Sequence, residues 1–543
     1  MTTRKKSWLI AIPVALAIAL IGLYIAGRHL MNRIQPMVRE QAIRYLSDHF
    51  HADVELASLD IHLPHLSTMG LAFHRQRGSI VQVDGQGLSL RRAGIPIFAA
   101  NKLHFTVDIA SVLEPRKAVD AVSLQGVRIT VPPKGEGGRP PESSPDQKDD
   151  IKDKKKKEPL NVQLDQVDIR DATLVILPKD KTRQPLFYHI DHLLMTPVGP
   201  DAPWNYAADL NIPKPPGHVL SRGRFGPWNA DEPGDTFLDG TYKFDHADLS
   251  VFNGIAGILS STGEFKGTLA AIRAKGEADV PDFRLNISGN RVSLKTHYEA
   301  LIDGTNGNTI LEPVHATLGQ TNFTTTGAIV KHDNNPMRTI SLVVAMPNGY
   351  LPDLLRLAMK GAPFMDGRIT LNTRIDIPPL TAKVKQKLVL DGTFNLREAK
   401  FLRSTVQSQI DGLSRHAQGQ PNNQEIDSVA SNMKGSFRLE NQLMTFRSFS
   451  FDVPGAGVAL AGNYNLKDDK LDFKGTLMLD ARLSQMVTGW KSWALKAVDP
   501  IFAKNGAGTF LNILVEGTAR KPQMGVEFAH HKFTAPVGKS HSK

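Results

Sequence analysis

The chain has 543 residues, of which 41% are apolar and 22% charged, so it has room for roughly two to four domains and is not disordered as a whole. It contains no cysteine, which excludes disulfide bonds and thiolate metal sites. The formal charge of +11 lies largely near the ends and in one basic segment, beside a candidate membrane anchor. We therefore interpret it as charge at a membrane surface and predict no binding to nucleic acid.

The N-terminal region predicts a membrane anchor. Residues 8–27 form an apolar run without a charged residue, and at about 1.5 Å per residue a helix of this length matches the roughly 30 Å hydrocarbon layer. Trp8 and Tyr24 stand near the two interfaces, and the basic tail 1–7 predicts a cytoplasmic N-terminus with the remainder exported. The alternative is a cleaved signal peptide. Because the run exceeds a signal-peptide core and no small-x-small site follows it cleanly, we predict an uncleaved anchor.

Residues 28–131 predict a helix followed by the first part of an exported β-sheet. Pro36 is well placed to open a helix. Four residues form the apolar stripe of this helix: Ile34, Val38, Ala42 and Leu46. Strand alternation then begins near Val54 and is clear at 103–109 and 127–131.

The composition changes abruptly over residues 132–159. This segment is rich in Gly, Pro and Ser and contains a dense Lys and Asp run at 148–157. Because it can bury almost no apolar surface, we predict a disordered Lys/Pro-rich loop. A solvated tether between two hairpins is the simpler interpretation, and contact of the basic run with anionic lipid headgroups is the alternative.

Residues 160–480 predict a continuation of the sheet, interrupted by a short helix near 351–359. The strand pattern is clearest at the end of this region. Three segments within 436–480 alternate apolar and polar residues and are separated by turn signals at 454–457 and 468–470. The apolar positions are Phe449, Phe451 and Val453, then Val458, Leu460, Gly462, Tyr464 and Leu466, then Leu471, Phe473, Gly475, Leu477 and Leu479. This pattern predicts an antiparallel meander with one apolar side.

The C-terminal region predicts a helix, the last strands and a tail. Residues 481–530 contain an amphipathic helix at 484–503, followed by strands. Such a helix could cap the end of the sheet, because an exposed sheet edge favours aggregation. We predict that residues 531–543 form a flexible tail.

The sequence carries none of the common enzyme signatures. It contains no nucleophile elbow, phosphate-binding loop, zinc-protease helix or dinucleotide fingerprint. Three histidine pairs have spacings that a metal could use, namely His49 with His51, His62 with His65, and His189 with His192. Each pair lacks an obvious set of further ligands, so we predict no catalytic residue, no metal site and no cofactor.

Several segments together resemble one family. The N-terminal anchor, the strand pattern of 161–174, the turn 303–309 and the region 453–466 are similar to those of AsmA-like envelope proteins. The resemblance implies a bacterial inner-membrane protein whose long, curled β-sheet extends into the periplasm, as in the related TamB-type proteins. It also implies an apolar concave face that carries phospholipid acyl chains between membranes during outer-membrane biogenesis.

The sequence therefore predicts a mainly β protein: a transmembrane helix, an elongated, curled antiparallel sheet that forms a groove, and a few short helices. The residues predicted to line the groove are Phe449, Phe451, Leu460, Tyr464, Phe473, Leu477 and Leu479. The same residues could instead fill an ordinary sandwich core. A non-catalytic assembly factor for other envelope proteins is the second hypothesis, and an anchored periplasmic enzyme is the third.

Overall fold

The structure is a computed structural model in which the described part of the chain is mainly β, with mostly antiparallel pairing. The structure describes residues 52–62, 80–108, 117–131, 162–177, 185–199, 202–227, 233–331, 337–487, 508–528 and 531–536. Residues 93, 305 and 520 within these ranges are not described, and some further positions in 39–48 and 496–503 are described. These residues form two compact units. Unit 1 takes those within 1–248, 260–274 and 303–305, and unit 2 takes those within 249–259, 275–302 and 306–543.

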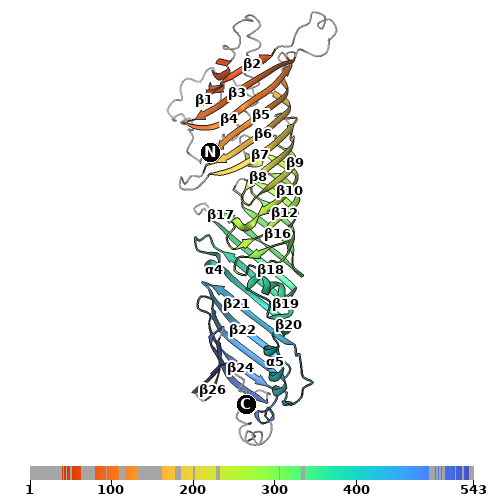
Figure 1. The fold of residues 1–543 in the computed structure, drawn as a ribbon, viewed down its shortest axis with the longest axis vertical. Helices are drawn as coiled ribbons and strands as arrows, with labels where there is room; N and C mark the ends of the chain where they lie inside the picture. The colour runs from red at the N-terminus through yellow and green to blue at the C-terminus, as the bar shows by residue number, and fades with distance from the viewer. Residues whose placement is uncertain are drawn as a thin grey trace, which may run out of the picture. The chain divides into compact units, whose positions relative to one another are not determined.

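Unit 1 is built on strands that follow one another in chain order (Figure 1). Its elements are β1 (Asp53–Glu55), β2 (Ser58–His62), β3 (Ile80–Arg92), β4 (Ile95–Asp108), β5 (Lys117–Val131), β6 (Val162–Ile176), β7 (Leu186–Thr196), β8 (Trp204–Pro213), β9 (Pro216–Phe225), η4 (Pro233–Asp235) and β10 (Phe237–Asp248). The strands β12 (Ile258–Thr268) and β13 (Ala271–Val280) contribute residues to both units.

The first strands of unit 1 enclose a sealed core. Both β1 and β2 pair with β3, and β3 continues through β4 to β5 in antiparallel order. Phe105 of β4 is only 1% exposed, and the helical residues Ala42 and Leu46 are fully buried in the same cluster. The predicted helical stripe is therefore confirmed at these two positions, where it helps to close the apolar side of the sheet.

Among the described strands, the pairing of β5 with β6 departs from the predicted antiparallel order. β5 and β6 pair in parallel, from Lys117 with Val162 to Val131 with Ile176. A parallel pair needs a long connection that returns the chain to the same end of the sheet, and the chain between Val131 and Val162 is long enough to do this. Pairing is again antiparallel from β6 to β10.

Unit 2 has a longer run of consecutive strands. Its elements are η5 (Leu249–Val251), β11 (Ile255–Ala256), β14 (Arg284–Leu285), β15 (Leu294–Ile302), β16 (Thr309–Leu318), β17 (Thr321–Lys331), β18 (Arg338–Tyr350), α3 (Leu351–Ala358), β19 (Met365–Ile377), α4 (Val384–Lys387), β20 (Val389–Phe401), α5 (Ser404–Ala417), β21 (Ser431–Glu440), β22 (Leu443–Val453), β23 (Ala456–Asn465), β24 (Lys470–Leu479), η6 (Leu483–Gln485), β25 (Thr509–Thr518), β26 (Lys521–Phe528) and β27 (His531–Pro536). Each of β15 to β26 pairs with the next strand in antiparallel order.

Two helices of unit 2 pack on the sheet and form small closed clusters. Leu351, Leu354 and Leu355 of α3 contact Met346, Ile369 and Leu396 from three strands. Ile410, Leu413 and Ala417 of α5 contact Val453, Ala456 and Leu479. The sequence predicted α3 near 351–359 but missed α5, whose helical apolar spacing is interrupted by the buried polar residues Asp411 and Ser414.

A buried carboxylate holds the start of α3 against the sheet. Asp353 is 2% exposed, and its Oδ2 accepts hydrogen bonds from the main-chain nitrogen of Gln320 at 2.8 Å and from Thr321 Oγ1 at 3.0 Å. Because Asp353→Ala leaves the buried hydroxyl of Thr321 and the main-chain nitrogen of Gln320 without this acceptor, we expect the opening free energy of the β16–β17 turn to fall by about 1–3 kcal/mol. Hydrogen exchange of peptides covering Gln320 measures this loss.

The control is Arg356→Ala, one helical turn further along α3. Arg356 is half exposed and lies 4.0 Å from Asp353. Its removal should change the opening free energy by less than about 0.5 kcal/mol. An equal effect of both substitutions would contradict the role given to the carboxylate.

Several predicted segments lie outside the described residues: the tail 1–7, the span 8–27 with Trp8 and Tyr24, the loop 132–159 and most of the helix at 484–503. Within the part of the chain that the structure describes, no helix has the length and apolar character that a membrane crossing requires. The prediction of a flexible tail over 531–543 is wrong for its first six residues. They form β27, because Phe533 and its neighbours pair with β26.

Candidate functional site

The predicted meander at 436–480 is confirmed by the strand register of unit 2. Phe449 on β22 lies opposite Gly435 of β21 and Leu460 of β23. Phe446 lies opposite Phe437 and Gly462 in the same way. Since directly paired residues of antiparallel strands point to the same side, the phenylalanines of neighbouring strands meet on one face. We call this side of β19–β24 the aromatic face. Five of its phenylalanines have rings that contact one another: Phe394, Phe437, Phe446, Phe449 and Phe473.

The phenylalanine rings lean toward one another across glycines. Phe446 and Phe473 flank Gly462 on the strand between them, and their ring centroids are 5.7 Å apart. The rings of Phe394 and Phe449 are 6.2 Å apart across Gly435. A Cβ atom on Gly462 would lie 2.1 Å from the main-chain oxygen of Asp472, so this position has no room for another residue. Aromatic side chains over strand glycines restore the packing that the glycine lacks.

The contacts among the rings join them into one layer. The ring of Phe394 also lies 6.3 Å from that of Phe437, and Phe446 meets Phe449 edge-on at 6.0 Å. Each of the five rings is only partly buried. Tilted and edge-on ring pairs of this kind stabilise one another beyond their simple burial. The layer therefore holds its shape while keeping part of its surface in solvent.

The aromatic face carries no charged residue among the described strands β19–β24. Its other members are uncharged and include Met365, Ile369, Leu371, Thr373, Ile375, Leu390, Gly392, Leu396, Phe401, Met433, Gly435, Leu439, Met444, Phe451, Val453, Ala456, Val458, Leu460, Gly462, Tyr464, Leu471, Gly475, Leu477 and Leu479. Eight of these members are buried: Met365, Ile369, Thr373, Leu396, Leu439, Val453, Ala456 and Leu479. The partly exposed remainder has the apolar character of a binding surface.

The seven residues predicted to line a groove fall into three groups. Phe449, Leu460, Tyr464 and Phe473 are partly exposed on the aromatic face. Phe451 and Leu477 lie on the same face but also pack against the cluster below α5. Leu479 is a correction to the prediction: at 2% exposure it belongs to that closed cluster and does not line an open surface.

Sequence reasoning missed Phe394, Phe437 and Phe446 as members of the site. Phe446 and Phe449 are three residues apart, so in a regular strand their side chains would point to opposite faces. The structure places a β-bulge between them, because β22 has one more residue there than β23. The extra residue returns Phe446 to the side of Phe449. Phe394 carried the clearer signal, since it alternates with Thr393 and Asn395.

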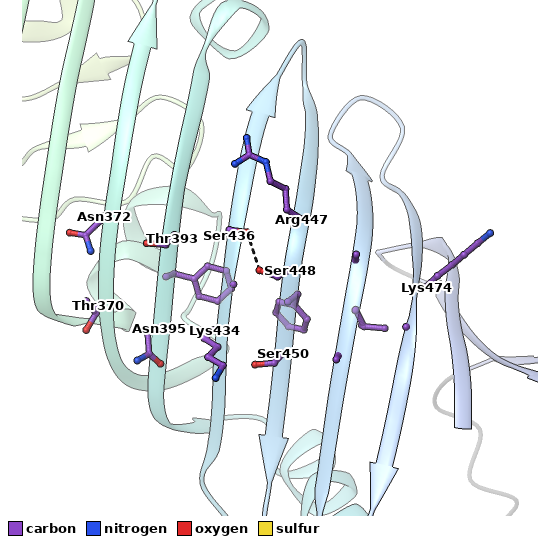
Figure 2. A pocket seen from close by; sticks show the side chains of 17 residues that line it. Thr370, Asn372, Thr393, Asn395, Lys434, Ser436, Arg447, Ser448, Ser450 and Lys474 are labelled. Carbon is purple, nitrogen blue, oxygen red and sulfur yellow. Dashed lines mark hydrogen bonds between the residues drawn. The ribbon is translucent and has the colours of Figure 1, made fainter. Parts of the chain in front are cut away.

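The opposite face of the same strands is polar and contains a hollow of about 660 Å³. Figure 2 shows its lining residues, with Ser436 and Ser448 joined by a hydrogen bond of 3.0 Å. Most of these residues alternate with the phenylalanines: Thr370, Asn372, Thr393, Asn395, Lys434, Ser436, Ser448, Ser450, Ala459, Ala461 and Lys474. Phe449 and Leu460 also border the hollow, but the register directs their side chains to the aromatic face, so they supply its floor. Thr, Asn, Ser and Lys side chains therefore border this hollow on the side of the sheet away from the aromatic face.

The charges of this region lie on the polar side. Asp391 accepts hydrogen bonds from Arg438 at 3.1 Å and from Arg447 at 3.0 Å. The hydrogen bond from Arg438 is the largest cause that lowers the pKa of Asp391, partial burial opposes it, and Arg447 adds to the lowering. On the aromatic face, burial raises the pKa of Tyr464, and the hydrogen bond from its hydroxyl to Asp469 at 3.0 Å raises it further. Tyr464 therefore remains neutral at neutral pH.

The arrangement can bind an apolar ligand. Each methylene group that leaves water for this surface contributes about 0.8 kcal/mol to the binding free energy, so four methylenes contribute about 3 kcal/mol.

Comparisons with known proteins do not identify a family. No family model, no curated protein and no solved structure matches the chain.

Proposed function

We propose that this protein holds or transfers phospholipids by their acyl chains on the aromatic face of unit 2, as an AsmA-like protein of the bacterial envelope. In this proposal, residues 8–27 anchor the chain in the inner membrane and the β-units act in the periplasm, in outer-membrane biogenesis. The observation that carries the proposal is the layer of five partly exposed phenylalanine rings on a face without charge.

Two physical features support binding of a chain over simple core packing. The rings contact one another and pack over glycines, which restricts their side-chain rotation before a ligand binds. Binding therefore costs less conformational entropy. The closed clusters under α3 and α5 show that this sheet can bury its apolar residues where a helix covers them. The rings between these clusters keep accessible area that a sealed core would not leave.

A second candidate function is a non-catalytic assembly factor that binds other envelope proteins. Aromatic residues are enriched at the centres of protein interfaces, and the aromatic face has this composition. The two functions differ in the occupant of the same surface. Neither requires a catalytic residue, because transfer of a lipid along a gradient breaks no bond.

Photo-crosslinking distinguishes the two functions. A benzoyl-phenylalanine at Phe473 places the probe on the aromatic face, and the same group at Lys474, the next residue, places it on the opposite side of β24. We expect phospholipid adducts at position 473 and few at position 474, measured by mass spectrometry of the full chain purified from membranes. Protein adducts at 473 would favour the assembly factor, and equal lipid adducts at both positions would contradict a face-specific site.

A further inference from the structure

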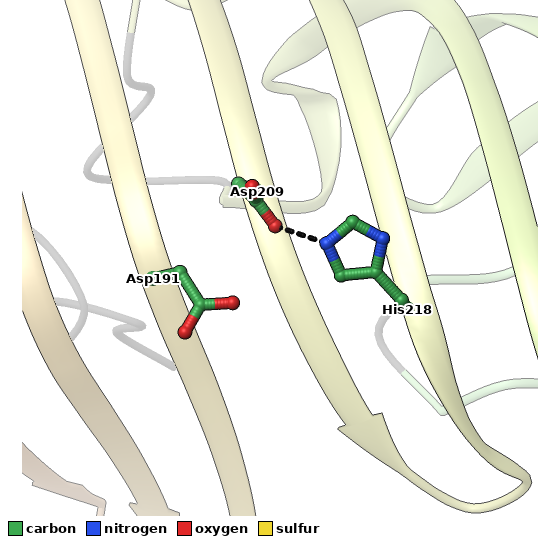
Figure 3. A group of neighbouring side chains, drawn as sticks. All are labelled: Asp191, Asp209 and His218. Atoms are coloured by element: carbon green, nitrogen blue, oxygen red, sulfur yellow. Dashed lines mark hydrogen bonds and ion pairs between the residues drawn. The ribbon is translucent and has the colours of Figure 1, made fainter.

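The polar side of unit 1 carries several histidines that each face an aspartate. His104 lies 2.7 Å from Asp84, and His192 lies 3.1 Å from Asp168. The densest group is found where β7, β8 and β9 pair. Figure 3 shows Asp191, Asp209 and His218 on these three strands. One ligand atom from each of these residues lies within 4.8 Å of the others.

The geometry of this group favours a shared ion. Asp209 Oδ1 and His218 Nε2 form a hydrogen bond of 2.5 Å, and a bound ion would take the place of its proton. Asp191 supplies a second carboxylate beside them. Two neighbouring carboxylates repel one another unless a cation lies between them. All three side chains retain access to solvent, so an ion can enter from the surface.

Outer hydrogen bonds orient the carboxylate of Asp191. His189 Nε2 lies 3.0 Å from Asp191 Oδ1, and Asn211 Nδ2 donates to Asp191 Oδ2 at 2.6 Å. Metal-binding carboxylates are commonly held by such outer partners, which fix the direction of the free lone pairs. Asp191 is therefore fixed in place without losing its capacity to bind a metal, since each carboxylate oxygen has a further lone pair.

A β-bulge brings Asp191 to this group. The pairing of β7 with β8 shifts between Ile190 and His192, which leaves Asp191 as the extra residue. A bulge redirects a side chain and is often found beside functional sites. In regular alternation Asp191 would point to the face opposite His192, away from Asp209.

We propose that Asp191, Asp209 and His218 bind a divalent transition metal ion, with Zn²⁺ as the best-fitting member of this class. The imidazole nitrogen favours Zn²⁺ over Mg²⁺ or Ca²⁺, which prefer oxygen ligands alone. Bonds of about 2.0–2.1 Å in a tetrahedral zinc site hold ligand atoms about 3.3 Å apart. Asp209 Oδ1 and His218 Nε2 are closer than this value, and all three ligand atoms lie within 4.8 Å of one another, so small rotations of the side chains complete the site.

The proposal assigns the ion a structural role. Its three ligands come from three consecutive strands, so the metal links β7, β8 and β9 across the polar side of unit 1. Water completes the coordination. Binding a metal to the folded state alone raises the midpoint of thermal unfolding.

The test measures binding of Zn²⁺ to the full chain after treatment with a chelator. Isothermal titration gives the affinity, and a thermal scan with and without Zn²⁺ gives the stabilisation. We expect Asp209→Asn and His218→Gln each to weaken Zn²⁺ binding at least about tenfold and to remove the thermal shift. The matched control is His104→Gln, which removes another histidine that faces an aspartate in the same unit and should leave binding unchanged.

Several outcomes would overturn the proposal. They are the absence of Zn²⁺ binding to the original chain, equal affinity for Mg²⁺, and the same loss in His104→Gln as in His218→Gln. Circular dichroism shows whether each variant is folded. If Asp209→Asn does not fold, Asp191→Asn takes its place, because the side chain of Asp191 is exposed on the bulge and its loss removes no core contact.

Discussion

Replacing Phe446 by aspartate is expected to lower the yield of phospholipid adducts at position 473 at least about tenfold. The rings of Phe446 and Phe473 are 5.7 Å apart, so the new carboxylate lies beside the probe on a face that carries no other charge. An acyl chain that covers an unpaired carboxylate removes it from water, which costs several kcal/mol, and each 1.4 kcal/mol corresponds to a factor of ten. Quantitative mass spectrometry of the adducts measures the loss.

The control for this prediction is Ser448→Asp. Ser448 lies two residues along the same strand, is exposed on the polar side, and contacts Ser436 there. It adds the same charge to β22 and should leave the adduct yield unchanged. Hydrogen exchange of β21–β23 shows whether the sheet is intact in both variants. An unchanged adduct yield in Phe446→Asp would exclude the aromatic face as the lipid site.

The sequence predicted where the strands of the aromatic face lie better than it predicted which residues form that face. Alternation of period two is a direct consequence of strand geometry, so 448–479 could be assigned without coordinates. The bulge beside Arg447 could not be predicted from the sequence, because one extra residue interrupts the alternation of apolar and polar residues. Phe394 was missed for a different reason. Its place beside Phe449 depends on the pairing of β20 with β21, which are separated in the chain by α5.

Alternation alone also does not show whether an apolar face is open. Phe105 and Phe449 both occupy apolar positions of alternating strands, but Phe105 is sealed in unit 1 and Phe449 keeps partial exposure. The difference depends on what packs over each residue, and the covering helix is distant in sequence. The same limit applies to Asp191, Asp209 and His218. They come together through cross-strand register, which spacing in the sequence does not reveal.

The substitution Leu479→Ala tests whether the closed cluster below α5 stabilises the strands without forming part of the exposed aromatic face. Leu479 is 2% exposed and packs with Ala417, Val453 and Ala456 below α5. Because the substitution removes buried methyl groups and leaves a cavity, it should lower the opening free energy of β23 and β24 by about 2–5 kcal/mol. Hydrogen exchange of peptides from these strands reports this change for each segment, without requiring the two units to unfold together.

Met478→Ala is the matched control for this substitution. Met478 is the preceding residue, points to the other side of β24 and is 39% exposed, so its truncation should change the opening free energy by less than about 0.5 kcal/mol. If Leu479 serves stability and Phe473 serves binding, Leu479→Ala should retain lipid adducts at position 473 under conditions where the strands stay folded. Loss of these adducts without loss of exchange protection would instead place Leu479 in the lipid site. The two measurements together therefore decide where the closed cluster ends and the binding surface begins.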